Sequence, residues 1–490
     1  MDSHASTPIV PETPVFRVLP IMVALCTAGF IGLFSETALN IALSDLMKTF
    51  ELSAATAQWL TTGYLLTLGI LVPVSGLLLQ WFTTRQLFIS ALAFAIAGTL
   101  LGALSFSFEL LMVSRVLQAI GTGLLLPLMF NTILIIFPPH KRGAAMGIVG
   151  LVIMFAPAAG PMLAGLMIEF LSWHYIFWFS LPLLILSLFC GIRYMQNVSA
   201  ITKPGIDLLS IALSTAGFGG IVFGFSHAGE SGGWSSMLVI VSIAVGAVSL
   251  VLFCLRQNVM KQPMLNLRVF QYPMFTVGLV MVFLCFMVIL SSMLVLPLFL
   301  QNAMAMSAMT AGLVLLPGGV LNGILSPIVG VLFDKFGPRW LVIPGLALIA
   351  VVLWFFSGVT VASSVGLIIV LHCCLMLGIS FVMMPSQTNG LNQLPKQLYP
   401  DGTAIMNTLQ QIAGAIGTAV SVSVLSKGVD SYMSRSAAPT NPHEAAIAFS
   451  NGSQNAFVFA MLVAVIGFAI ALFIRRVKVA KGAEAARSMH

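Results

Sequence analysis

Charged residues are scarce in this 490-residue chain. Lys, Arg, Asp and Glu make up 7% of it, with 21 basic and 14 acidic side chains, against roughly 25% in a soluble domain. So few charges cannot cover the water-facing surface of a soluble protein of this length, which excludes a soluble enzyme. Disorder is excluded as well, because 59% of the residues are apolar and 35 are Phe, the reverse of a disordered composition.

The motifs of several chemistries are also missing. No GxxxxGK[ST] sequence is present, so the chain has no P-loop of its own for ATP. The six cysteines all fall in apolar runs without CxxC spacing, which argues against a metal site or a disulfide framework. The formal charge of +7 fits basic residues that flank membrane helices better than a nucleic-acid partner. We therefore expect no enzymatic activity, no cofactor, no metal and no nucleic acid.

Long apolar runs are what the chain does have. About 20 apolar residues span the hydrocarbon core of a bilayer as a helix, and backbone polar groups in lipid must be satisfied within the span. Fourteen runs qualify, at 18–43, 56–79, 87–104, 110–136, 143–168, 176–194, 208–226, 237–255, 274–300, 311–332, 341–359, 365–384, 403–425 and 456–474. We predict an all-α integral membrane protein with fourteen transmembrane helices.

The basic residues predict the orientation of these spans. If the N-terminus is cytoplasmic and the spans alternate, seventeen of the 21 Lys and Arg lie in inner segments. Only Lys48, Lys427 and Arg435 lie in outer loops, and Arg115 lies within a span. This asymmetry follows the positive-inside rule, so we expect both termini in the cytoplasm. A chain with twelve spans would also place both termini on the same side of the membrane, so this count alone does not distinguish twelve spans from fourteen.

Two parts of the chain repeat each other. Gly and Arg are nine residues apart both at Gly76 and Arg85, after the second span, and at Gly330 and Arg339, after the tenth. The offset between the copies is 254 residues, which predicts two six-helix halves at 1–205 and 263–490. The remaining spans, in 206–262, would form an inserted pair that packs against lipid outside the halves. Six-helix repeats with a site at their interface are typical of transporters.

Three spans carry motifs with a family resemblance. Span 143–168 contains Ala156-Pro157-Ala-Ala-Gly160-Pro161, and span 110–136 contains Arg115-Val-Leu-Gln118-Ala-Ile-Gly121. With Thr37-Ala-Leu-Asn40 in the first span, they resemble the major facilitator superfamily, specifically its fourteen-helix drug:proton antiporter branch. The resemblance implies a bacterial multi-pass protein of the cell membrane, driven by the proton gradient, that exports drugs. We expect it to act as a monomer on small amphipathic substrates.

The chain departs from the family pattern at two places. Ser35 stands where the first-span element usually has Asp, and the carboxylate is one residue later, at Glu36. In the loop after the second span, Gln80 replaces the usual acid, and the better copy is Asp334 in the second half. The resemblance thus implies gate loops that contain Gly76, Arg85, Gly330, Asp334, Gly337 and Arg339.

Glu36 and Arg115 are the ionisable residues placed deepest in the predicted spans. An acid at the centre of a membrane helix costs roughly 2.5 to 3.5 kcal/mol, so a functional role is the default interpretation. Both lie in the outer half of their spans, and we expect them to share one polar site. Glu36 would carry the proton and Arg115 would tune it, since Arg keeps its charge. The alternatives are a permanently protonated or statically paired Glu36 and a purely structural Arg115.

Other polar and small residues supply further candidates. Some polar side chains on apolar spans should face a substrate cavity, although hydrogen bonds between helices explain any single one equally well. The cavity candidates are Asn40, Tyr64, Gln118, Asn131, Gln387 and Gln411. Small residues in span 143–168 fit either ordinary close packing or a rocking interface between the halves. That set is Gly147, Ala156, Pro157, Gly160, Pro161 and Gly165.

Three functional hypotheses follow. The first is a proton-coupled secondary exporter of amphipathic, often cationic, drugs that works by alternating access. The second keeps the transporter and changes the cargo to a lipid, a fatty acid or an endogenous metabolite. The third is a membrane-embedded enzyme or a passive channel. The absence of a catalytic motif argues against the enzyme, and the repeated halves with a lone deep acid argue against the channel.

Overall fold

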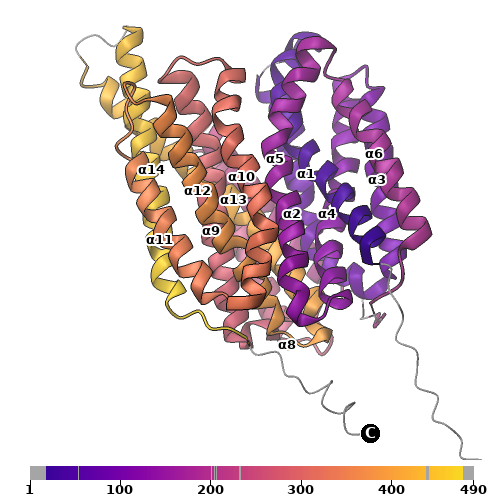
Figure 1. The fold of residues 1–490 in the computed structure, drawn as a ribbon. Helices are drawn as coiled ribbons and strands as arrows, with labels where there is room; N and C mark the ends of the chain where they lie inside the picture. Colours follow the sequence, from indigo (N-terminus) through magenta and orange to yellow (C-terminus); the bar gives the residue numbers. More distant parts are fainter. Residues whose placement is uncertain are drawn as a thin grey trace, which may run out of the picture.

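The computed structural model describes residues 18–52, 54–199, 201–203, 205, 207–230, 233–436 and 441–477. These residues form fourteen α-helices (Figure 1). The helices are α1 (Val18–Thr49), α2 (Ala54–Trp81), α3 (Thr84–Ala103), α4 (Phe108–Ile136), α5 (Arg142–Phe170), α6 (Tyr175–Tyr194), α7 (Leu208–Glu230), α8 (Met237–Val259), α9 (Pro273–Asn302), α10 (Ala308–Phe336), α11 (Arg339–Phe356), α12 (Val365–Asn392), α13 (Tyr399–Met433) and α14 (Pro442–Ala471). Short 3₁₀ helices at Pro139–Lys141, Leu267–Gln271 and Lys396–Leu398 lie in the connections.

Each predicted span corresponds to one of these helices. Thirteen are long and apolar enough to cross a membrane, and α5 makes a fourteenth if its two bent parts are taken as one span. The bend separates Pro139–Pro157 from Met162–Phe170, where prolines remove backbone donors from the helix. The prediction of an all-α protein with fourteen apolar helices is confirmed for the described residues.

The helices pack as two groups that lie side by side in Figure 1. In the first group, α1 packs on α5 and α6, and α4 packs on α2 and α3. In the second, α9 packs on α12, α13 and α14, and α12 packs on α10 and α11. The groups meet where α5 packs along α10 and where α2 packs along α13.

The groups are closest at one end of these helices. At the start of α5 and the end of α10, a Cβ on Gly143 or Gly330 would overlap the backbone of the other glycine. At mid-length, Gly323 still packs against Phe155. Toward the opposite end, a Cβ on Gly165 or Gly312 would meet nothing within 4 Å. We call the closed end, where α5 begins and α10 ends, the basic end, because seventeen of the Lys and Arg were predicted on that side.

The inserted helices α7 and α8 lie at the seam between the groups. Most residues of helix α8 are exposed or half-buried. Helix α7, however, packs on both α2 and α13. A Cβ on Gly69 of α2 would lie 3.1 Å from Val222 of α7. In the connection between α7 and α8, Trp234 Nε1 donates a hydrogen bond of 2.5 Å to Ser423 Oγ of α13.

Candidate functional site

A buried polar cluster surrounds Arg115 of α4, whose side chain is fully buried. Its Nη1 donates to the carbonyl oxygen of Ser35 at 3.0 Å and to Ser35 Oγ at 3.1 Å, both on α1. Its Nε donates to the carbonyl oxygen of Leu60 on α2 at 3.3 Å, and Nη1 also reaches Gln118 Oε1 at 3.0 Å. The guanidinium therefore joins α1, α2 and α4 through neutral acceptors.

Tyr64 of α2 lies against the same guanidinium. The Arg115 Cζ lies 4.2 Å from the centre of the Tyr64 ring, a cation–π geometry that stabilises a desolvated cation. The phenol of Tyr64 donates to Thr122 Oγ1 at 2.8 Å and to the carbonyl oxygen of Gly32 at 3.0 Å. Tyr64 is fully buried, so its ring and hydroxyl both hold helices together.

Gln118 completes this cluster. Its Oε1 accepts from Ser35 Oγ at 3.1 Å, and its Nε2 donates to Thr99 Oγ1 of α3 at 3.0 Å. Thr99 and Thr122 were not predicted as members of this cluster. Thr122 could have been found, because it lies four residues after Gln118 and therefore on the same face of α4.

Glu36 lies beside this cluster without an ion pair to its cation. It follows Ser35 on α1, is partly exposed, and lies within electrostatic range of Arg115 and Tyr64. No ion pair within 4.0 Å joins Glu36 to Arg115 in the part of the chain that the structure describes. In the same part of the chain, Arg115 Nη2 has no hydrogen-bond partner. The cation thus keeps one free donor close to the acid.

The other cavity candidates are spread over several helices. Asn131 of α4 is buried and donates to Ser199 Oγ at 3.0 Å. Gln387 of α12 is buried, and within the described chain neither of its side-chain polar atoms has a hydrogen-bond partner. Gln411 of α13 is partly exposed. The side chain of Asn40 lies outside the described residues.

The small residues of α5 allow two neighbouring helices to approach it closely. A Cβ on Gly147 would lie 2.5 Å from the carbonyl oxygen of Ser326 on α10. Gly160 lies directly against Thr37 of α1. Helix α5 therefore approaches α10 on one side and α1 on the other. In the rest of the set, Ala156 is buried, Pro157 is partly exposed, Gly165 has open space around it, and the side chain of Pro161 lies outside the described residues.

Asp334 closes the basic end between α10 and α5. Its two carboxylate oxygens accept from the backbone N–H groups of Gly143 and Ala144, each at 2.9 Å. These are free donors in the first turn of α5, where the helix dipole favours an anion. Gly330, one turn earlier on α10, lets the backbones approach closely enough for both bonds.

Arg142 adds a second contact across the same end. Its Nη1 donates to Asn392 Oδ1 of α12 at 2.9 Å and to the Tyr399 hydroxyl of α13 at 3.0 Å. Its Nη2 donates to the carbonyl oxygen of Leu134 at 2.5 Å. One side chain therefore ties the α4–α5 connection to two helices of the second group.

The remaining gate candidates have different positions. Gly76 of α2 faces α13. Arg85 donates to the carbonyl oxygen of Ile192 at 2.8 Å and so stays within the first group. Gly337 ends α10 with a φ of 82°, which favours glycine. Arg339 begins α11 and is exposed.

We expect Arg115→Leu to lower the thermal stability of the purified protein. The substitution removes the bonds from the guanidinium to the carbonyl oxygens of Ser35 and Leu60 and to the amide oxygen of Gln118. Hydrogen bonds to a charged group contribute about 1.5 to 3 kcal/mol each, so a loss on the order of 3 kcal/mol is expected. Thermal unfolding in detergent measures it, and Arg115→Lys should lose less because Lys keeps the charge. Unchanged stability in both variants would contradict the bridging role.

Comparisons with known proteins match this architecture. The profile of the Major Facilitator Superfamily matches residues 25–418. Lincomycin resistance protein LmrB of Bacillus subtilis (strain 168) is 67% identical over 95% of this chain and 97% of its own length. The protein of the same name from Listeria monocytogenes serovar 1/2a is 62% identical over 94% of this chain and 98% of its own length.

Among solved structures, the human organic anion transporter MFSD10 has a similar fold. It superposes with a TM-score of 0.65 at 13% identity, covering 92% of this chain and 99% of that one. The family profile and the LmrB relatives confirm the resemblance that the motifs indicate, and the family is one of transporters, not of enzymes. This chain belongs to the Major Facilitator Superfamily.

Proposed function

We propose that this protein is a proton-coupled exporter of amphipathic, cationic drugs and that lincomycin is one of its substrates. Both relatives reported above are named for lincomycin resistance and match almost the whole chain. The two six-helix halves, 1–205 and 263–490, would rock against each other about the seam that holds the site. A monomer contains both halves, so one chain suffices for the cycle.

The observation that carries the coupling is the relation between Glu36 and Arg115. The guanidinium is held by neutral acceptors, while Glu36 lies nearby without an ion pair to it among the described residues. An acid that is not locked in a salt bridge can change its protonation as its hydration changes. The nearby cation favours release of the proton, and burial favours its uptake.

The direction of access follows from the closed end. The positive-inside rule supports a cytoplasmic position of the basic end, and with that orientation the closed basic end corresponds to a state that is closed toward the cytoplasm. In this state Glu36 would load a proton from outside and drug would leave. Opening of the basic end would then expose the site to the cytoplasm, where the proton leaves and the next drug molecule binds.

Reconstituted transport tests this proposal. In vesicles with an imposed proton gradient, lincomycin transport should require the gradient and stop on addition of an uncoupler, and a sodium gradient should not replace it. Transport that follows sodium alone would contradict proton coupling. A normal drug response with an altered lipid or metabolite pool in cells lacking the protein would favour the alternative cargo.

We expect Asp334→Asn to weaken the closed basic end. An amide replaces one carboxylate oxygen with an NH2 group, so the arrangement in which each oxygen receives one N–H group of α5 is lost, and the amide lacks the charge that the helix terminus favours. Hydrogen bonds to a charged group contribute about 1.5 to 3 kcal/mol each, so the inward-open population should rise at least about tenfold. Spin-label distances between α5 and α10 at this end measure the shift. Asp334→Glu is the control that keeps the charge. An unchanged distance distribution in Asp334→Asn would contradict the latch.

A further inference from the structure

The segment that joins α8 to α9 turns two consecutive side chains into the protein, although connecting segments normally run over the surface. Met264 and Leu265 are each only 2% exposed. A Cβ on Gly76 of α2 would lie 3.0 Å from Leu265 Cδ2 and 3.0 Å from the Cβ of Ala404 on α13. Leu265 therefore lies where α2 and α13 meet at the basic end.

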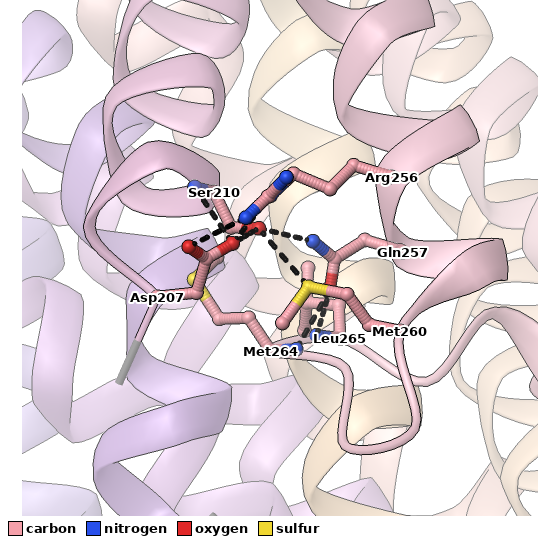
Figure 2. A network of polar contacts seen from close by, with 7 residues as sticks. All are labelled: Asp207, Ser210, Arg256, Gln257, Met260, Met264 and Leu265. Carbon is pink, nitrogen blue, oxygen red and sulfur yellow. Dashed lines mark hydrogen bonds and ion pairs between the residues drawn. The ribbon is translucent and has the colours of Figure 1, made fainter. Parts of the chain in front are cut away.

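Gln257 at the end of α8 fixes this segment. Its Oε1 accepts from the backbone N–H groups of Met264 at 2.6 Å and Leu265 at 3.2 Å. Its Nε2 donates to Ser210 Oγ of α7 at 2.6 Å. Figure 2 shows this side chain between the start of α7 and the segment. One buried amide thus sets the position of Leu265 relative to α7.

Asp207 and Arg256 hold the other side of this network (Figure 2). Asp207 precedes α7 and accepts from Ser210 N at 3.2 Å and from Ser210 Oγ at 2.5 Å. Arg256, next to Gln257, donates from Nε and Nη2 to its two oxygens at 2.6 and 2.9 Å. The bond from Arg256 holds the pKa of Asp207 well below its usual range. The pair is therefore charged at neutral pH and joins α7 to α8.

The segments before α7 and after α8 are both hydrogen-bonded to the helices of the seam, α2 and α13. After Leu265, the Asn266 N–H donates to Asp401 Oδ1 at 3.0 Å, in the first turn of α13. Before α7, the N–H groups of Thr202 and Lys203 donate to the carbonyl oxygen of Gln80 at 3.1 and 3.2 Å, in the last turn of α2. The inserted helices α7 and α8 are thus connected, through these flanking segments, to the end of α2 and to the start of α13.

These contacts fall where the two halves of the protein differ. In the second half, Asp334 latches α10 to α5. The matching position in the first half, at the end of α2, is Gln80. Gln80 has no carboxylate that could accept the backbone N–H groups at the start of α13 as Asp334 does for α5. At this seam the contacts between the helices are supplemented by Leu265 and by the Asn266–Asp401 bond.

We propose that α7, α8 and the 260–267 segment form a clasp that keeps α2 and α13 closed at the basic end, with Asp207, Arg256 and Gln257 as its positioning residues. The proposal rests on the proposed alternating access. It gives the inserted pair a role in the cycle: the clasp must release Leu265 from Gly76 before the basic end can open.

Cysteine accessibility tests this clasp in the full-length protein. In a variant without the six native cysteines, Ala404→Cys reports opening of the basic end and Gly312→Cys reports the opposite end. A water-soluble maleimide is the probe, applied in membranes without drug or proton gradient. Asp207→Asn and Gln257→Leu should each raise labelling at 404 about tenfold and lower labelling at 312. Arg256→Lys should cause a smaller change, because Lys keeps the charge and loses the two-bond geometry.

The matched control is Glu444→Gln at the opposite end. That carboxylate also accepts two side-chain hydrogen bonds, from Tyr432 and Ser436, but it lies beside the last turn of α13, whereas the 260–267 segment contacts the first turn. Labelling at 404 that is the same in Asp207→Asn, Gln257→Leu and Glu444→Gln would overturn the clasp. So would a rise at both reporters, which indicates loss of structure. Altered labelling in a protein that does not transport lincomycin would refute the proposed substrate and leave the clasp standing.

Discussion

Glu36→Gln should reduce the lincomycin resistance of an efflux-deficient host to the level of the same host without the protein. The amide has nearly the shape of the protonated acid but cannot release a proton, so the coupled cycle stops. Because Glu36 makes no ion pair with Arg115 in the described structure, the substitution leaves the bonds of Arg115 to α1 and α2 in place. A drug-susceptibility panel measures the effect, with the amount of protein in the membrane determined in parallel.

Two further variants make this result specific. Glu444→Gln removes a carboxylate at the start of α14 and should leave resistance unchanged. Glu36→Asp keeps an ionisable group on a shorter side chain and should retain part of the resistance. A Glu36→Gln protein that still accumulates drug against a gradient would show that the proton is carried elsewhere.

Gly330→Ala should abolish transport by preventing the basic end from closing. The added methyl would overlap the carbonyl group of Gly143 and come within 3.1 Å of Ala144 Cα. Backbone atoms cannot rotate away as a side chain can, so α5 and α10 must separate. That separation also breaks the bonds of Asp334 to α5. We expect loss of drug resistance together with spin-label distances at this end that stay long.

The same helices offer matched controls for this substitution. Alanine at Gly165 of α5 or at Gly312 of α10 meets nothing within 4 Å, so both proteins should transport normally. If Gly330→Ala transports as well as these two variants, close contact at the basic end is not required for the cycle. If all three fail, the cause is a general sensitivity of these helices and not the contact itself.

The helices were predictable because membrane spans are encoded locally. A run of about 20 apolar residues indicates a span on its own, and each of the fourteen runs corresponds to a helix. The contact between α5 and α10 at the basic end was only partly predictable. Asp334 was singled out from a motif, but that its partners are the backbone N–H groups of α5 depends on how two distant helices pack.

The polar cluster shows what a one-dimensional pattern cannot supply. Arg115 was placed near Glu36 from depth alone, yet its bonds go to Ser35, the preceding residue. Neighbouring residues on a helix point about 100° apart, so the rotation of α1 about its axis decides which one meets the guanidinium. That rotation is set by packing against α4 and α5. The burial of Leu265 in a connecting segment likewise has no local signal in the sequence.

The hydrogen bond from Trp234 to Ser423 bears on which helix group the inserted pair α7 and α8 moves with. It attaches the α7–α8 connection to α13, and Asn266 attaches the far side of the pair to the same helix. Toward α2, two backbone bonds to Gln80 hold the segment before α7, but the middle of α7 itself offers mainly glycine and aliphatic surfaces, such as Val222 on Gly69. Such a surface can slip, whereas polar anchors resist it. Helices α7 and α8 would therefore move together with α13 and the second group. Alternating access would then be a rotation of six helices, as one rigid body, against a rigid body of eight.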